Sequence, residues 1–290
     1  MFSQPTRKRF GQHWLTSEAV LRRIVAAAAL SPTDCVLEIG PGTGILTQAM
    51  LPLSQAVLAV EIDRDLSRRL SQKFAQVPNF YLVEGDVLTV DLTTLEHPLL
   101  AAQHSAANLA ADRPLGLPNK VVANIPYYIT GPILEKLLGT IASPNPHPYE
   151  SIILLVQKEV AARLCAKPGN RSFGALSVRV QYLADCSLVC LVPAKAFQPP
   201  PKVDSAVVQI RPRPLTVAAS QPTYLDQLVR LGFSSKRKML RNNLKGSVDR
   251  DQLLAAMADL GIAATARAED MSVEQWVALS NRLGRRDTIL

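Results

Sequence analysis

The sequence of 290 residues has only four cysteines and no apolar run long enough to cross a membrane. The four cysteines are Cys35, Cys165, Cys186 and Cys190. Their spacing matches no metal-ligand or disulfide pattern, which favours buried free thiols in a reducing compartment. The longest apolar run, Ile24 to Leu30, is far shorter than the roughly 18 residues of a membrane helix. The basic segment at 7–9 is followed by polar residues, so we expect no secretory signal there. We predict a cytoplasmic protein with no metal site and no membrane contact.

The whole chain has a net charge of +8, and acidic residues are scarce in two of its segments. Residues 1–23 have a net charge of +4 and residues 230–250 one of +6, which leaves −2 for the rest. Such local excess is typical of a polyanion-binding surface, although solvated helix faces also carry basic residues. The candidate polyanion-binding residues are Arg7, Lys8, Arg9 and Arg22 in the first segment and Lys236, Arg237, Lys238, Arg241 and Lys245 in the second.

Short apolar runs alternate with helical patterns through the first two thirds of the chain. The expected strands are 35–39, 56–62, 80–83, 120–123 and 151–156, and the expected helices are 17–31, 45–51, 65–74, 129–138 and 158–164. This alternation predicts an α/β fold with a parallel sheet covered on both faces. Residues 97–119, rich in alanine and with three prolines, interrupt the pattern and are expected to form an inserted loop.

A hairpin pattern over 188–210 ends the α/β part, and only helical signals follow residue 214. Ser235 can cap a helix that runs to Gly246, on which Arg237, Arg241 and Lys245 would form one stripe. Ser272 and Gln275 form a capping box for a last helix that ends near Gly284. We predict an α/β domain at 1–212 and a small all-helical domain at 213–290.

The strongest local motif is VLEIGPGTG at 36–44, where a strand ends, glycines turn the chain and a helix begins. Gly40, Gly42 and Gly44 allow the backbone to approach a ligand beside a helix N-terminus. The dinucleotide fingerprint G-x-G-x-x-G fails, because its last position falls on Ile45 or Thr47. The pattern E-x-G-x-G-x-G instead resembles motif I of S-adenosylmethionine-dependent methyltransferases.

Two acidic residues end the following strands. Glu61 lies 21 residues after Gly40, where a carboxylate can accept hydrogen bonds from both ribose hydroxyls of a nucleoside. Asp86, in VEGDVL, can receive the amino group of the same nucleoside's adenine. Each alone is also compatible with a solvated strand end, with Asp63 competing for the role of Glu61. The series of three strand ends favours the nucleoside interpretation.

The motif Asn124-Ile125-Pro126-Tyr127 follows the fourth strand and resembles the (D/N/S)-P-P-Y signature of enzymes that methylate ring-conjugated amino groups. Such an amino nitrogen is a poor nucleophile because its lone pair is delocalised. The Asn124 oxygen and a backbone carbonyl can accept its two N–H groups and expose that lone pair, while a proline adds no donor. Tyr127 can stack on a base taken out of its helix.

Phe197 begins a stiff, proline-rich loop, FQPPPKV at 197–203. Phe197 can form the second wall of an aromatic clamp on the target base. A phenylalanine that only anchors the loop to the core remains an alternative.

Several segments together resemble the small-subunit rRNA adenine dimethyltransferase family, also called the KsgA/RsmA family. They are RKRFGQHWL at 7–15, LEIGPGTGILT at 37–47, EID at 61–63, EGDVL at 84–88, NIPYYIT at 124–130, FQPPPKVDSAVV at 197–208 and FSSKRKMLRNNL at 233–244. They span nearly the whole chain. The family more often has Asn and Phe at the positions of His13 and Trp14.

The resemblance implies a Rossmann-like class I methyltransferase with a seven-stranded, mostly parallel sheet and a helical C-terminal domain that helps to hold rRNA. It implies an S-adenosylmethionine site lined by His13, Leu15, Gly40, Gly42, Glu61, Ile62, Asp86, Val87 and Asn124. The implied activity is N6-dimethylation of two adjacent adenosines near the 3′ end of 16S rRNA in the 30S subunit, with a role in small-subunit biogenesis. We expect a monomer.

Three alternatives stay open at this point. A large-subunit rRNA adenine methyltransferase of the macrolide-resistance type has a related sequence, but the 197–203 loop and the long basic C-terminal domain favour the small-subunit enzyme. A non-catalytic ribosome-assembly or transcription factor on the same fold is disfavoured by the intact motif at 124–127. The third alternative is a DNA amino-methyltransferase.

Overall fold

The computed structural model describes residues 13–98, 116–214 and 217–284. These residues form two compact units. The first contains the described residues up to Leu137, Pro146–Ala161 and Cys186–Pro212; the second contains Leu138–Asn145, Ala162–Asp185 and the described residues from Arg213 onward. The second unit therefore also includes segments that precede residue 213, whereas the functional division into 1–212 and 213–290 stays a prediction. Most of the 97–119 insertion, at 99–115, lies outside the described residues.

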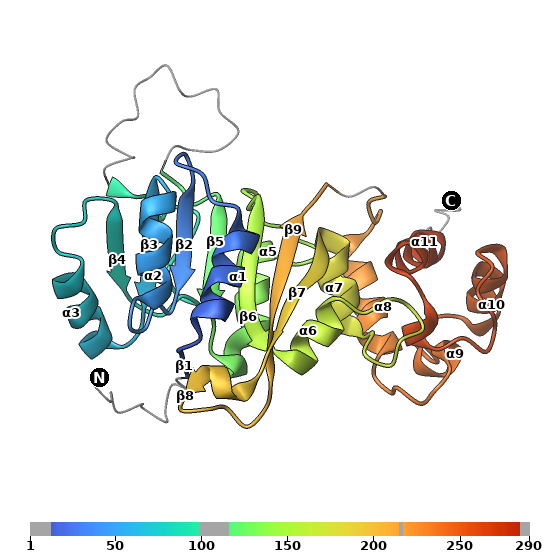
Figure 1. Ribbon diagram of the computed structural model, residues 1–290. Helices are drawn as coiled ribbons and strands as arrows, with labels where there is room; N and C mark the ends of the chain where they lie inside the picture. The colour runs from blue at the N-terminus through green and yellow to red at the C-terminus, as the bar shows by residue number, and fades with distance from the viewer. Residues whose placement is uncertain (1–12, 99–115, 215–216, 285–290) are drawn as a thin grey trace, which may run out of the picture. The chain divides into compact units, whose positions relative to one another are not determined.

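A seven-stranded sheet forms the centre of the first unit (Figure 1). Its strand order is β4-β3-β2-β5-β6-β9-β7. The strands from β4 to β6 pair in parallel, and β9 pairs antiparallel with β6. The predicted seven-stranded, mostly parallel sheet is therefore confirmed. Its strands are β2 (Cys35–Ile39), β3 (Ala56–Glu61), β4 (Phe80–Glu84), β5 (Lys120–Asn124), β6 (Ser151–Gln157), β7 (Ala184–Val192) and β9 (Ser205–Pro212).

Helices cover this sheet. Every residue of β2 and β3 is buried, as expected of parallel strands covered on both faces. Figure 1 shows α1 and α2 in front of the sheet and α5 behind it. The helices and short 3₁₀ turns of this part are α1 (Glu18–Ala28), α2 (Ile45–Met50), η2 (Leu51–Leu53), α3 (Arg64–Lys73), η4 (Tyr127–Ile129), α5 (Thr130–Leu138), α6 (Lys158–Leu164) and η5 (Ala194–Ala196).

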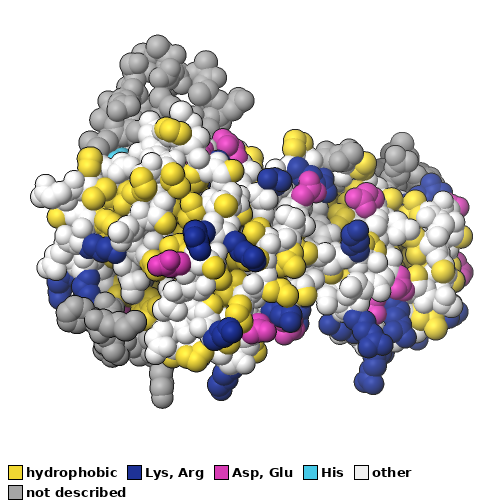
Figure 2. All heavy atoms as spheres, in the orientation of Figure 1, with side chains coloured by type: hydrophobic (Ala, Val, Ile, Leu, Met, Phe, Trp, Pro, Cys, Tyr) yellow, Lys and Arg dark blue, Asp and Glu magenta, His cyan; other side chains and the backbone are white. Residues whose placement is uncertain are grey.

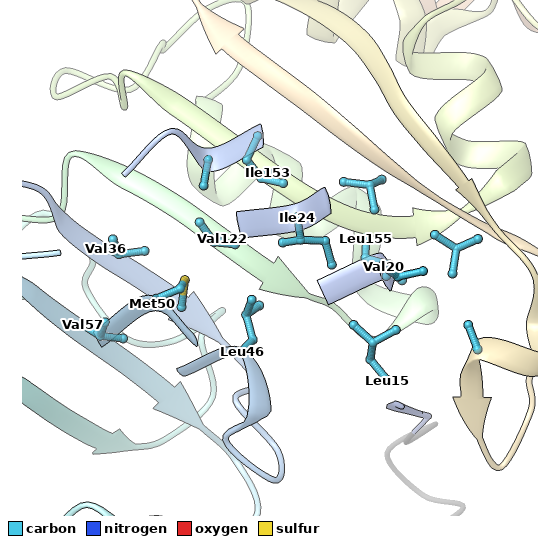
Figure 3. Close-up of a cluster of buried hydrophobic side chains, with 14 of the residues drawn as sticks. Leu15, Val20, Ile24, Val36, Leu46, Met50, Val57, Val122, Ile153 and Leu155 are labelled. Carbon is cyan, nitrogen blue, oxygen red and sulfur yellow. The ribbon is translucent and has the colours of Figure 1, made fainter. Parts of the chain in front are cut away.

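The main core lies between α1, α2, α3 and one face of the sheet (Figure 3). Val20 and Ile24 of α1 lie over β5 and β6, and Leu46 and Met50 of α2 lie over β2 and β3. The apolar spacing of α1 places Val20, Ile24 and Ala28 on its buried face, and the Ser17 hydroxyl caps the helix. Burial of these faces fixes the loops at the carboxyl ends of the strands.

A short two-stranded sheet holds the segment before α1. Strand β1 (Trp14–Leu15) pairs antiparallel with β8 (Phe197–Gln198). The backbone N–H and the hydroxyl of Thr16 both donate to the carbonyl of Ala196, at 2.9 and 3.0 Å. Two segments that lie far apart in the sequence, 14–16 and 196–198, are thus held beside each other.

The second unit is helical. Its helices are α7 (Ala175–Leu183), α8 (Pro222–Gly232), α9 (Leu240–Asn243), α10 (Arg250–Asp259), η6 (Ala268–Asp270) and α11 (Val273–Gly284). Trp276 is fully buried, and a Cβ at Gly232 would lie 2.4 Å from its ring, so only glycine fits there. The predicted capping box is confirmed: the Ser272 N–H donates to Gln275 Oε1 at 3.0 Å, and the Gln275 N–H donates to Ser272 Oγ at 3.2 Å.

The predicted helix from Ser235 to Gly246 is wrong. Only α9, four residues long, is helical there, because Met239 has an extended backbone with ψ of 148°. The Asn243 amide donates to the carbonyls of Gly232 and Ser235, and the Leu240 N–H donates to the carbonyl of Ala266, which stabilises a turn instead. Arg237, Arg241 and Lys245 therefore do not form a helical stripe. In the described ranges, no helix is long and apolar enough to cross a membrane.

Candidate functional site

A pocket opens at the carboxyl ends of the parallel strands, which is the usual ligand position in open α/β sheets. It is lined by β1 and the residue before it, the glycine turn after β2, the end of β3, the loop after β4 and the turn after β5. All nine residues predicted to line a cofactor site are among its lining residues: His13, Leu15, Gly40, Gly42, Glu61, Ile62, Asp86, Val87 and Asn124. The structure brings these residues together, whereas their individual roles stay predictions.

The glycine turn forms the floor of the pocket. Gly40, Gly42 and Gly44 have φ of 65°, 60° and 75°, values that side chains disfavour. A Cβ at Gly40 would meet nothing within 4 Å, so the missing side chain leaves space beside the backbone. A Cβ at Gly42 would lie 2.4 Å from the Trp14 ring, so glycine is required for β1 to pack against the turn.

Glu61 ends β3 with its carboxylate held by two backbone N–H groups. Gly42 donates to Oε2 at 3.1 Å and Asp63 donates to Oε1 at 3.0 Å. Burial raises the pKa of Glu61, although the hydrogen bonds from Asp63 and Gly42 act in the opposite direction. Each carboxylate oxygen has a second lone pair, so both can accept a further hydrogen bond from a ligand in the pocket.

Asp86 lies in the loop after β4 that forms one wall of the pocket. The Gly85 N–H donates to the carbonyl of Glu61 at 2.8 Å, which ties this loop to β3. Asp86 Oδ1 accepts a hydrogen bond from the Leu88 N–H at 2.9 Å, which fixes the side chain. The carboxylates of Glu61 and Asp86 therefore line the same pocket from neighbouring strands.

Glu38 also lines the pocket, and the sequence analysis did not assign it a role. It is only 1% exposed, and Thr47 Oγ1 donates to its Oε2 at 2.6 Å. Burial raises the pKa of Glu38 to about 8; the Thr47 hydrogen bond lowers it and the charge of Glu61 raises it further. Glu38 therefore keeps its proton to a higher pH than an exposed carboxyl group does. The available signal was its position as the acidic residue that begins the E-x-G-x-G-x-G pattern.

Asn124 ends β5 with its side-chain amide oriented by the segment before β1. Its Nδ2 donates to the backbone carbonyl of His13 at 3.3 Å. Within the described residues the side chain makes no other hydrogen bond, so Oδ1 is available as an acceptor in the pocket. The next residues position the turn: Ile125 is buried in the core, and Pro126 has φ of −61° and no N–H.

Tyr127 is held by two contacts. Its hydroxyl lies 2.6 Å from Oγ of Ser205, a buried residue of β9. Its ring is stacked with the His13 ring, with centroids 6.0 Å apart and an interplanar angle of 22°. His13 Nδ1 in turn lies 2.8 Å from the carbonyl oxygen of Pro199. Burial raises the pKa of the Tyr127 hydroxyl, so it stays neutral.

Phe197 lies elsewhere. Its ring is 2% exposed and belongs to the main core, opposite Leu15 in the β1–β8 pair. Phe197 is not one of the described residues that line the pocket. This position corresponds to the alternative of a core-anchoring phenylalanine, and the aromatic clamp stays a prediction.

Most of the predicted polyanion-binding residues that the structure describes are exposed. Arg22 lies on α1, and Lys236, Arg237, Lys238 and Lys245 are exposed around α9, with Arg241 half-buried. Within the described ranges no ion pair involves these side chains. Figure 2 shows Lys and Arg side chains gathered on the second unit, in the region of α9. Arg7, Lys8 and Arg9 lie outside the described residues.

The fold and the pocket define an S-adenosylmethionine-dependent methyltransferase with a Rossmann-like sheet. Residues 3–285 match the family described as ribosomal RNA adenine dimethylase. The chain belongs to this family and is an S-adenosylmethionine-dependent rRNA adenine dimethyltransferase.

Known proteins support this assignment. The chain is 59% identical to ribosomal RNA small subunit methyltransferase A of Trichormus variabilis over 96% of this chain and 98% of that protein. A crystal structure of a dimethyladenosine transferase from Plasmodium falciparum has the same fold, with a TM-score of 0.72 and 24% identity over 92% of this chain and 96% of that one. The crystal structure of 23S rRNA methyltransferase ErmE is also similar, with a TM-score of 0.69 and 27% identity over 94% of this chain and 100% of that one.

Proposed function

We propose that this enzyme dimethylates the N6 amino groups of two adjacent adenosines in the 3′-terminal hairpin of 16S rRNA, within the 30S subunit. The observation that carries this proposal is the position of Asn124 Oδ1, an available acceptor beside the glycine turn and Glu61 in one pocket. The 59% identity to a small-subunit enzyme over nearly the full length supports the choice of substrate. The modification would make the enzyme part of small-subunit biogenesis.

The pocket fits S-adenosylmethionine on three grounds. The missing side chain at Gly40 leaves space beside the backbone, the buried Glu61 carboxylate can still accept hydrogen bonds, and Asp86 offers a second carboxylate. Glu61 would hold the ribose hydroxyls, Asp86 the adenine amino group, and His13, Leu15, Ile62 and Val87 would complete the walls. When bound, the cofactor supplies an electrophilic methyl group on a sulfonium.

Asn124 would activate the target amino group. Its Oδ1 accepts one N–H bond, and a backbone carbonyl of the same turn accepts the other. These two bonds draw the nitrogen toward tetrahedral geometry, which makes its lone pair available. They strengthen as the nitrogen pyramidalises, so they stabilise the transition state more than the bound substrate. The His13 carbonyl keeps the Asn124 oxygen, rather than its NH₂ group, in the pocket.

Tyr127 would stack on the flipped target base. Its contacts with Ser205 and His13 restrict the ring before the base arrives. Less conformational entropy is then lost on binding, which favours a stacked complex. Phe197 would act at the target base only if its ring left the core.

The predicted polyanion-binding residues would bind rRNA phosphates. They are Arg22, Lys236, Arg237, Lys238, Arg241 and Lys245, together with Arg7, Lys8 and Arg9 outside the described residues. We assign catalysis to 1–212 and rRNA binding chiefly to 213–290, and we expect a cytoplasmic monomer. Sedimentation of the purified protein measures its oligomeric state and tests this expectation.

The experiment is transfer of labelled methyl groups to unmethylated 30S subunits, with the modified nucleotides mapped. The expected result is dimethyladenosine at two adjacent positions near the 3′ end of 16S rRNA. Label in large-subunit rRNA would favour the activity named for the ErmE structure, and label in DNA would favour a DNA enzyme. No transfer to any of the three substrates, with cofactor bound, would favour a non-catalytic assembly factor.

A further inference from the structure

Tyr128 follows Tyr127 directly and lines the same pocket, yet its environment differs. It is 63% exposed, which makes it the most exposed of the large apolar side chains in the described residues. No ring contact or hydrogen bond of its side chain is present among those residues. A large aromatic side chain that lines the pocket is therefore mostly exposed to solvent, which is the arrangement expected of a contact surface for a ligand.

The backbone at Tyr128 is firmly held. The residue is the middle one of η4, where the Ile129 N–H donates to the carbonyl of Pro126 at 3.3 Å. The buried Thr130 hydroxyl donates to the carbonyl of Tyr127 at 3.0 Å. A ring on a fixed backbone loses only its side-chain freedom when a base stacks on it.

The 3₁₀ geometry separates the two tyrosine rings. With three residues per turn, side chains at successive positions diverge by about 120°. Tyr127 turns toward His13 and Ser205, whereas Tyr128 faces solvent. The two rings therefore favour two different bases. A target base that reaches Asn124 and Tyr127 brings its chain neighbours to the mouth of the pocket, where the ring of Tyr128 lies.

We propose that Tyr128 is a substrate-binding residue that stacks on the nucleotide next to the target adenosine. This inference rests on the proposed function, because it assumes that a target base occupies the pocket beside Asn124. Stacking tolerates any base, since every base has a π-face. Tyr128 would therefore hold the strand on which the target base is flipped without selecting its sequence.

The first part of the test compares Tyr128→Ala, Tyr128→Phe and Tyr128→Trp with the wild type. Single-turnover methyl transfer is measured against the concentration of unmethylated 30S particles. Tyr128→Ala should raise the half-saturating concentration about fivefold to 150-fold, which corresponds to about 1–3 kcal/mol per stacked base. The rate at saturation and the S-adenosylmethionine affinity should stay within about twofold. Tyr128→Phe and Tyr128→Trp should restore tight binding, because the stacking surface is retained.

Tyr81→Ala is the matched control. Tyr81 is the other large aromatic residue that is exposed in the described ranges, at 36%, and it lies on β4 outside the pocket lining. Its replacement should leave the half-saturating concentration unchanged. An equal effect at both positions would show general loss of surface tyrosine rather than a nucleotide contact, and would overturn the proposal.

The second part removes the partner instead of the tyrosine. The 30S particles are reconstituted with rRNA in which the nucleotide on the 5′ or the 3′ side of one target adenosine is abasic. With one of these two substrates, the half-saturating concentration of the wild type should rise about as much as Tyr128→Ala raises it on intact particles. On that same substrate, Tyr128→Ala should cause no further rise. An unchanged effect of Tyr128→Ala on both substrates overturns the proposal. If the wild type methylates no particle, the proposed function itself fails, and this inference falls with it.

Discussion

The amino and the carboxyl ends of the parallel strands form two edges of the sheet with similar polar residues. The two edges differ in whether the hydrogen-bonding groups of these residues have partners within the fold. At the amino ends of β2 and β5, Asp34 Oδ2 accepts hydrogen bonds from Lys120 Nζ at 2.9 Å and the Ser31 N–H at 2.6 Å, and Oδ1 accepts one from Asn119 at 2.7 Å. At the carboxyl ends, Asn124 keeps an acceptor that no described residue uses. A polar group with all its partners stabilises the fold, whereas one with a partner missing is available to a ligand.

The pKa values follow the same contrast. Burial acts to raise the pKa of Asp34, but hydrogen bonds from Asn119, Lys120 and Ser31 outweigh it and hold the pKa below the usual value. Burial prevails at the other edge, where the pKa values of Glu38 and Glu61 are both raised. Hydrogen bonds therefore stabilise the carboxylate form at the amino ends of the strands, and burial favours the protonated form at the carboxyl ends.

The largest effect is expected when one asparagine at each edge of the sheet is replaced by alanine. Asn124→Ala should lower the single-turnover methyl-transfer rate by roughly 10²–10³, the typical value of one such transition-state hydrogen bond. Its cofactor affinity and thermal stability should change little. Asn119→Ala, at the amino edge, should lower stability and leave the rate at saturation unchanged, because Asn119 bonds only within the fold. Near-normal transfer by Asn124→Ala would contradict the mechanism.

Lys120→Met should destabilise the protein by about 3 kcal/mol, because it leaves the Asp34 carboxylate buried without its cation. Since the folded-state pKa of Asp34 is lowered, its stabilisation is present above the unfolded pKa of about 3.9 and is lost as pH falls through the folded value. The variant should therefore lose less stability on acidification than the wild type. Urea unfolding from pH 3 to 7 measures both effects, and superimposable curves would refute them.

Glu61→Ala should weaken S-adenosylmethionine binding about tenfold to 150-fold, the equivalent of about 1.5–3 kcal/mol for hydrogen bonds to a charged group. Binding to 30S subunits should largely persist, since Glu61 lies inside the pocket. Calorimetric titration of the cofactor provides the measurement. An unchanged affinity would remove Glu61 from the cofactor site.

Glu38→Gln should change the pH dependence of stability in the absence of cofactor. The folded wild type keeps the Glu38 proton up to a pKa of about 8, whereas the unfolded chain releases it near its ordinary value of 4.5. Stability contributed by this proton is complete below about pH 4.5 and is lost as pH rises to about 8, with a slope of up to about 1.4 kcal/mol per pH unit. Glu38→Gln should lack this slope in unfolding experiments, and equal slopes would show that Glu38 is ionised in the fold.

The smallest effect is expected from the Tyr127 hydroxyl. Tyr127→Phe loses the bond to Ser205, worth about 1 kcal/mol, and should retain most activity, whereas Tyr127→Ala also loses the stacking surface. Ser205→Ala should add little to Tyr127→Phe, because the first substitution has already removed the pair. Methyl-transfer assays of the single and double variants decide this. Equal damage from Tyr127→Phe and Tyr127→Ala would assign the function to the hydroxyl.

The pocket could be predicted because its residues follow strands in the sequence. Glycines and acids at strand ends must meet at one edge of a parallel sheet, so Gly40, Glu61, Asp86 and Asn124 were assigned together. Glu38 was missed because it lies inside the apolar run of β2, although it also begins the E-x-G-x-G-x-G pattern. The partnership of Tyr127 with Ser205, 78 residues away, depends on how β9 pairs with β6, and local sequence does not determine that register.

The helix predicted after Ser235 failed for a tertiary reason. The local pattern favours a helix, but the bonds of Asn243 and Leu240 to distant carbonyls stabilise the turn that replaces most of it. Phe197 shows the same limitation in another form. Its sequence context allowed both a clamp and a core anchor, and only the pairing of β1 with β8 places its ring in the core.

The pairing of β1 with β8 has a consequence for the time at which the enzyme becomes active. The carbonyl that orients Asn124 belongs to His13, and His13 precedes a strand whose partner is residues 197–198. A nascent chain that ends before Phe197 already contains the glycine turn, Glu61, Asp86 and Asn124, but it lacks the strand that fixes β1. Synthesis therefore delivers the chemistry-bearing residues first and the part that aligns them later, so an unfinished chain on the ribosome would contain an unaligned site.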